Sequence, residues 1–245
     1  MRYFSYILTF ALVILIANNT NADQRTFVWT YQYQTLKPGE AEFEQYTTLS
    51  TPRGNQFERK TSIEHQFELE VGMTPRYDFS IYQVFKQAAG GNYRYEAFKL
   101  RGRYRLGDEA GSWVKPILYF EYKANQNFTA QKVEFKPIVG MQGDPYIIAI
   151  NPKLEWEKKG KAEAKILWGY SGAIGYKIYK LLAFGVELSG SKKGHYFGPT
   201  ISHGTEHLWV SLGAGYLTSK VDPADPVDEI KIRLLIGVGI PNGKE

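Results

Sequence analysis

Basic side chains recur at every second position between residues 99 and 105. Lys99, Arg101, Arg103 and Arg105 alternate with residues such as Leu100 that would occupy the opposite face of an extended chain. In a β-strand, side chains two residues apart point to the same side, about 7 Å from each other. Like charges at this spacing repel one another. The row therefore predicts either acidic partners on neighbouring strands or contact with an anionic solute.

The same alternation gathers charged side chains of other segments on one face. We predict that the lumen or solute-contact residues are Lys99, Arg101, Arg103, Arg105, Glu64, Glu68, Glu70, Lys132, Lys136 and Arg233. Two interpretations of this set stay open. The charges can pair across a narrow interior and fill it, or a surplus of bases can leave a channel that attracts anions.

Residue types that could support catalysis or bind a metal are few. Ser202 precedes His203, but no nucleophile, base and orienting group can be assembled from the spacing. His203 and His207 lack a third zinc ligand. The aspartates of "VDPADPVDE" (221–229) do not match a calcium-binding loop. We therefore predict no enzymatic activity, no metal site and no cofactor.

These side chains must be positioned by β-strands, because the pattern has a period of two. In "SIEHQFELEVGM" (62–73), apolar residues occupy one face and glutamates the other, whereas a helix would scatter the charges. Turn signals divide the chain into twelve predicted strands, at 40–49, 62–73, 77–86, 94–106, 113–124, 128–140, 145–157, 163–177, 181–190, 195–202, 207–218 and 229–240. Several of these are as long as the ~9–11 residues that cross a bilayer when tilted.

The connections between these segments alternate in length. Those at 74–76, 141–144 and 203–206 are tight, whereas those at 50–61 and 219–228 are long. Outer-membrane barrels have short periplasmic turns and longer extracellular loops. The chain is therefore predicted to be all-β, an antiparallel transmembrane β-barrel of about twelve strands. Its first strand would begin, and its last strand would end, on the periplasmic side.

The aromatic segment "FVWTYQYQ" precedes the first predicted strand. Pairing residues 26–35 with 40–49 as a thirteenth wall strand would make the count odd. We therefore predict that residues 23–39 form an N-terminal extension that plugs the lumen, lies at its periplasmic mouth or pairs only partly with the wall. The alternative is that a strand such as 195–202 is miscounted and that 26–35 is strand one of twelve.

Residues 1–22 have the features of a cleaved secretory signal: Arg2, the apolar run "YILTFALVILIA" and the small residues of "TNA". Cleavage would leave the extension and a barrel domain at 40–245, and would lower the formal net charge from +5 to +4 because Arg2 is lost. The chain has no cysteine, which is common among Gram-negative envelope proteins. Export makes nucleic acid an unexpected partner.

Two further residue types carry positional predictions. Trp113, Trp156, Trp168 and Trp209 fall near strand ends or on outward faces, which favours an interfacial girdle over the core of a β-sandwich. Prolines interrupt three predicted strands, and because each removes a ladder hydrogen bond, bulges or strand boundaries are expected there. These residues are Pro116, Pro137 and Pro152.

Several stretches, in this order along the chain, resemble a large group of Gram-negative outer-membrane β-barrels. They are "LKPGEAEFEQYTT" (36–48), "ELEVGMTPRYDFSIY" (68–82), "FGVELSG" (184–190), "HYFGPTIS" (195–202) and "IKIRLLIGVGI" (230–240). The group includes proteins similar to the MetA-pathway phenol-degradation transporters and uncharacterised outer-membrane proteins. The resemblance implies a barrel and an envelope location, but no substrate.

The expected function is that of a passive channel or transporter for small solutes, including anionic ones, in the cell outer membrane. The expected partners are outer-membrane lipid, lipopolysaccharide, the barrel-assembly machinery and a small anionic solute. One alternative is a structural or adhesive envelope barrel with a closed, charge-filled lumen. A second is a soluble periplasmic β-protein that binds an apolar ligand.

Overall fold

The structure is a computed structural model that describes residues 24–52, 60–107, 115–179, 181–205, 207–221 and 227–240. The predicted signal peptide, Trp113, Asp222 and Asp225 lie outside these ranges. Among the described residues, no helix is both long and apolar enough to cross a membrane.

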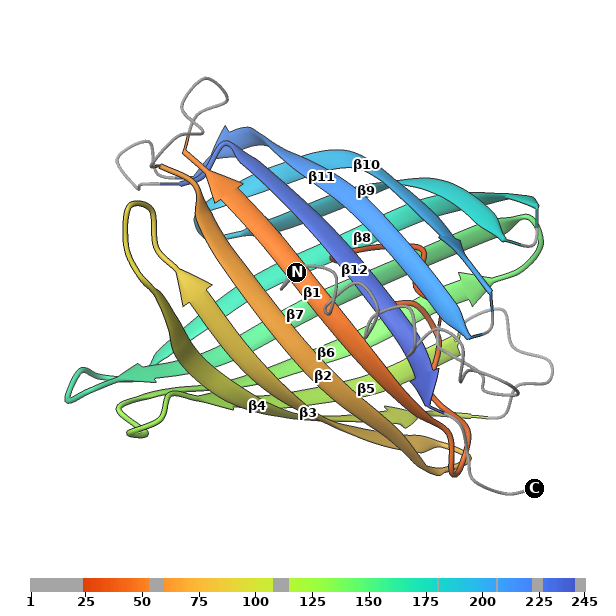
Figure 1. The fold of residues 1–245 in the computed structure, drawn as a ribbon, viewed down its shortest axis with the longest axis horizontal. Coiled ribbons are helices and arrows are strands. Elements are labelled where there is room, and N and C mark those ends of the chain that lie inside the picture. The colour runs from red at the N-terminus through yellow and green to blue at the C-terminus, as the bar shows by residue number, and fades with distance from the viewer. Residues whose placement is uncertain are drawn as a thin grey trace, which may run out of the picture.

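Twelve antiparallel strands form one closed barrel, in which each strand pairs with its neighbours in sequence and β1 pairs with β12 (Figure 1). The strands are β1 (Ala41–Thr51), β2 (Ser62–Thr74), β3 (Tyr77–Gln87), β4 (Tyr93–Arg105), β5 (Lys115–Ala124), β6 (Ala130–Gln142), β7 (Tyr146–Lys159), β8 (Lys165–Tyr179), β9 (Leu182–Ser191), β10 (Gly194–Gly204), β11 (Leu208–Lys220) and β12 (Ile230–Ile240). The predicted all-β fold and strand count are confirmed, and each boundary lies within two residues of its prediction.

The alternation of side chains separates the two faces of the wall. Large apolar residues such as Leu69, Ile81 and Leu188 are exposed on the exterior. Their neighbours Glu68 and Glu70 are fully buried in the interior. An apolar outer face around a polar lumen is the arrangement found in transmembrane barrels.

Prolines leave the strands continuous. Pro116 lies opposite Val139 in the β5–β6 ladder. Pairing between β6 and β7 stops after Phe135 and Leu154 and resumes at Val139 and Ile150 in the same register. The predicted bulges at prolines are therefore wrong: Pro137 and Pro152 lie in this gap, where each lacks the N–H that would continue the ladder.

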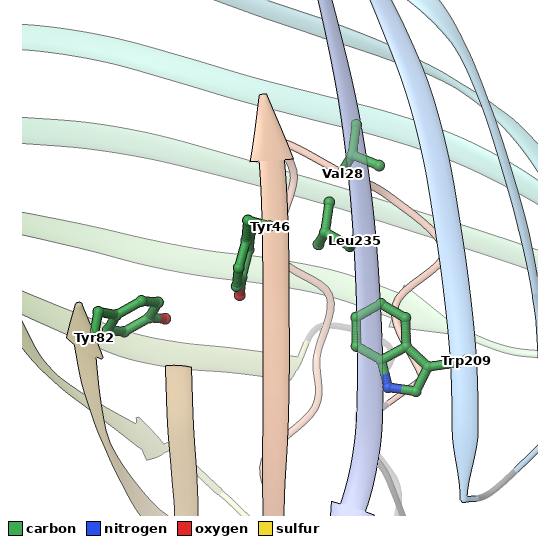
Figure 2. Close-up of a cluster of buried hydrophobic side chains, with 5 residues drawn as sticks. All are labelled: Val28, Tyr46, Tyr82, Trp209 and Leu235. Carbon is green, nitrogen blue, oxygen red and sulfur yellow. The ribbon is translucent and has the colours of Figure 1, made fainter. Parts of the chain in front are cut away.

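Part of the lumen is filled by a hydrophobic cluster. It consists of Val28, Tyr46, Tyr82, Trp209 and Leu235 (Figure 2). Trp209 is completely buried and its Nε1 donates a 2.5 Å hydrogen bond to Glu42 Oε1. The girdle prediction is wrong for Trp209, because odd-numbered side chains of β11 point inward; Trp156 and Trp168 are exposed on the exterior.

The chain before β1 runs inside the barrel. Residues 24–40 contain no strand, and Phe27 and Val28 have no exposed surface. The segment joins β1 at the end of the barrel that carries the short β2–β3 turn, where Gly39 N–H donates to the carbonyl oxygen of Gly72. Since 195–202 lies within β10, the alternative in which 26–35 is a wall strand is excluded. We call residues 24–36 the luminal segment.

Candidate functional site in the lumen

The luminal segment is held by a carboxylate of β9. The backbone N–H groups of Val28, Trp29 and Thr30 all donate to the Glu187 carboxylate, at 2.7, 2.9 and 2.9 Å. Glu187 is buried, and no cation among the described residues lies within ion-pair distance of it. Three charge-assisted hydrogen bonds therefore satisfy a carboxylate that would otherwise be costly to bury.

The side-chain amide of Asn151 on β7 binds both backbone groups of Tyr31, the next residue of the segment. Asn151 Oδ1 accepts a 2.6 Å hydrogen bond from the backbone N–H of Tyr31, and Asn151 Nδ2 donates a 3.0 Å bond to the Tyr31 carbonyl. Wall hydroxyl groups complete the attachment: Thr200 Oγ1 on β10 donates to the Thr26 carbonyl at 3.1 Å. The segment thus uses wall side chains, rather than strand pairing, to satisfy its backbone.

Glycines on the inner wall make room for the segment. A Cβ atom added to Gly175 on β8 would lie 3.1 Å from the Phe27 ring and 3.3 Å from Thr26 Cγ2. A Cβ on Gly185 of β9 would lie 2.8 Å from the same ring. The wall is therefore shaped to the side chains that it encloses, and bulkier residues at these positions would collide with Phe27.

The basic row of β4 is neutralised by carboxylates of β2 and β3. Arg101 Nη2 lies 2.8 Å from Glu68 Oε1 and 2.5 Å from Glu70 Oε2. Arg103 Nη2 contacts Glu70 and lies 2.7 Å from Asp78 Oδ2. The two arginines are 1% and 2% exposed, so they cannot contact a solute while the lumen has this arrangement.

The two ends of the row have other partners. Lys99 Nζ forms a 3.2 Å ion pair with Glu121 on β5. Arg105 Nη2 donates to the side chain of Thr35 in the luminal segment. All four members of the row therefore point into the barrel, as the alternation indicates, and each is paired. The role of the row in solute contact stays a prediction.

The remaining predicted residues also lie on the inner face. Lys132 bridges Glu134 and Glu155 at 3.2 Å each, and Lys136 pairs with Glu134 at 2.8 Å. Glu64 accepts a 2.6 Å hydrogen bond from Gln66. Arg233 donates to Thr48 and to the Val28 carbonyl, at 2.9 and 3.2 Å.

Sequence reasoning missed part of this network. Glu42 and Glu44 are buried on the inner face of β1 and add two carboxylates to the lumen. Arg25 of the luminal segment donates a 3.0 Å hydrogen bond to Tyr46 and lies 3.8 Å from Glu44. The alternation of 40–49 could have placed both glutamates inside. No local pattern identified Arg25, because its segment has no regular structure.

The residues considered for catalysis do not converge. Ser202 is buried in the lumen, whereas His203, its neighbour on β10, is exposed on the exterior. Adjacent strand residues point to opposite faces, so this serine and histidine do not form a nucleophile–base pair. Among the described residues, no cluster of three or more His, Asp or Glu side chains could hold a metal ion.

Several solved structures share this fold. The COG4313 outer membrane channel from Pseudomonas putida F1 is 14% identical, with a TM-score of 0.64 over 87% of this chain and 100% of that one. The KdgM porin is 9% identical, with a TM-score of 0.60 over 82% of this chain and 99% of the porin. The NanC porin is 8% identical, with a TM-score of 0.58 over 82% and 100%. No family model and no curated protein matches the sequence.

Proposed function

We propose that this protein is an outer-membrane channel for small solutes, whose lumen is closed in the present state by its own luminal segment. The observation that carries the proposal is the attachment of that segment. It fills a polar barrel interior but is held by side-chain hydrogen bonds, which can be released without opening the sheet. The likeness in fold to outer-membrane channels and porins agrees with this proposal.

The exterior supports an outer-membrane location over the soluble alternative. Exposed side chains such as Phe120, Ile150 and Leu154 would contact hydrocarbon, whereas a soluble protein would leave them in water. In this proposal the exterior binds outer-membrane lipid and lipopolysaccharide, the signal peptide directs export, and the barrel-assembly machinery inserts the chain. A relationship to the MetA-pathway phenol-degradation transporters stays a prediction.

A second candidate function is a permanently closed envelope barrel with a structural role. The buried ion pairs of Arg101 and Arg103 favour it, because they cover the inner face of β2, β3 and β4 without any help from the luminal segment. The two candidates differ in what happens when the luminal segment leaves. A channel opens, whereas in a closed barrel these ion pairs still block the lumen.

Single-channel recordings in planar bilayers separate the candidates. The full chain is expected to show low or intermittent conductance, and a variant that lacks residues 24–36 is expected to conduct steadily at a higher level. Heat-modifiable mobility in SDS gels serves as the control that both barrels are folded. A folded, truncated barrel without conductance would favour the closed structural barrel.

Ion selectivity of the truncated barrel tests the anionic solute. Without the luminal segment, Arg105 and Arg233 lose the Thr35 and Val28 contacts and can face the pore. We expect a reversal potential that indicates anion preference under a KCl gradient, and a weaker preference as salt screens these charges. Cation preference would contradict the anionic part of the proposal.

A further inference from the structure

A recess of about 220 Å³ remains in the lumen beside the luminal segment. Trp29 of that segment forms part of its lining, together with β6, β7, β8, β9, β10 and β12. It extends to Ser191 and Gly194, which flank the β9–β10 connection at the end of the barrel opposite the β2–β3 turn. Pockets for drug-sized ligands measure about 300–1,000 Å³, so only a small molecule fits here.

The charge of the recess has one sign. Lys136, Lys153 and Lys231 line it, and its lining contains no carboxylate. Lys136 and Lys153 are paired outside the lining, with Glu134 at 2.8 Å and Glu155 at 2.7 Å. Lys231 interacts electrostatically with Asp228, which lies outside the lining, but forms no ion pair with a carboxylate among the described residues. This lysine can therefore bind an anion without breaking an existing ion pair.

The rest of the lining suits a ring. Trp29 and Tyr196 are aromatic, and Ser171 and Ser189 add hydroxyl groups. The Nζ atom of Lys231 lies 3.9 Å from the centroid of the Tyr196 ring, so charge and aromatic surface meet at one point. A flat ligand with a carboxylate on its edge would use both.

A second recess differs from the first in both charge and composition. That recess, of about 250 Å³, is lined by lysines such as Lys123 and Lys132 but also by Glu155 and Glu157. Its mixed charges can neutralise one another, and its lining contains no aromatic residue. It provides a matched control site.

We propose that the first recess binds a small carboxylate built on a six-membered ring, with the carboxylate at Lys231 and the ring against Trp29. This ligand would be the solute of the proposed channel, so its physiological role rests on the proposed function. Binding itself does not require conduction. The ring can belong to an aromatic acid or to a sugar acid, since the face of a benzene ring and the C–H face of a pyranose are similar in size and each ligand carries one carboxylate.

Isothermal titration calorimetry on the refolded full chain in detergent tests the proposal. Benzoate and glucuronate are the two probes, and glucose is the neutral control. Saturable binding of either acid, without binding of glucose, is expected. Benzoate alone would identify an aromatic acid, and glucuronate alone a sugar acid. Binding of neither acid, or equal binding of glucose, would overturn the proposal.

Two variants locate the ligand. Lys231→Met is expected to weaken binding of the acid about tenfold, the loss typical of one charge-assisted hydrogen bond. Lys123→Met, in the second recess, is expected to leave binding unchanged. Equal loss in both variants would indicate a general effect of luminal charge and would overturn the site. Heat-modifiable mobility shows that each variant is folded.

Conductance of the same preparations separates this inference from the proposed function. Acid binding by a barrel that never conducts, with or without residues 24–36, would retain the recess as a ligand site and overturn the channel. Conductance without acid binding would retain the channel and overturn the recess.

Discussion

The Glu187 carboxylate accepts a 2.9 Å hydrogen bond from the backbone N–H of Trp29, a residue 158 positions earlier in the chain. The same carboxylate accepts the N–H groups of Val28 and Thr30. One side chain of the wall therefore fixes three consecutive residues of the luminal segment. This relationship makes the position of the segment testable without disturbing the sheet.

Glu187→Ala should detach the luminal segment. Three backbone donors lose their acceptor, and hydrogen bonds to charged groups each contribute about 1.5–3 kcal/mol. Amide hydrogen exchange at residues 28–30 should accelerate at least tenfold, while exchange in the wall strands stays the same. Leu188→Ala, at the adjacent outward position, is the control. Unchanged protection at residues 28–30 would show that Glu187 is not the anchor.

Gly175→Val should expel Phe27 from the wall. The three heavy atoms nearest to the new Cβ all belong to the luminal segment, namely two atoms of the Phe27 ring and Thr26 Cγ2. Fluorescence from a probe attached at Gln24 should then report a mobile segment in a barrel that still resists SDS. Gly172→Val is the matched control, because Gly172 lies on the outward face of the same strand and its Cβ would have ordinary contacts. An immobile segment in Gly175→Val would contradict the close fit.

Arg101→Leu should destabilise the barrel by about 3–5 kcal/mol, since it leaves the buried carboxylate of Glu68 without its cation and leaves Glu70 with Arg103 alone. The free energy of unfolding in urea, followed by gel mobility, measures this loss. Replacing Glu68 with Gln in the same chain removes the unpaired charge and should recover part of the stability. An additive double variant would show that the two residues are not coupled.

Leu234→Arg should cost about 2–4 kcal/mol in a bilayer if its position near the middle of β12 faces hydrocarbon at the midplane. Leu234→Ala is the control for lost side-chain volume. Refolding titrations into lipid vesicles compare the two. Equal stability of the arginine and alanine variants would contradict a lipid-facing exterior.

The wall could be predicted from the sequence because its pattern is local. Each strand sorts apolar and polar side chains with a period of two, so the face of Glu68 or Arg101 follows from its neighbours alone. The alternating connection lengths and the even number of strands then predict that the first strand begins and the last strand ends on the same side of the membrane. The same logic indicated which acids could neutralise the basic row, and Glu68, Glu70, Asp78 and Glu121 do so.

The contents of the lumen were decided by tertiary structure. Residues 27–33 alternate as a strand would, yet they form no strand, and the hydrogen bonds of the luminal segment reach side chains as distant in sequence as Glu187 and Thr200. The same holds for Trp209, whose inward position places it between Glu42 and Gly237. Closing the barrel brings together inner-face residues that are far apart in sequence, such as Trp209 and Glu42. Pairings across that interior depend on barrel diameter and register, which are properties of the whole sheet rather than of any one strand.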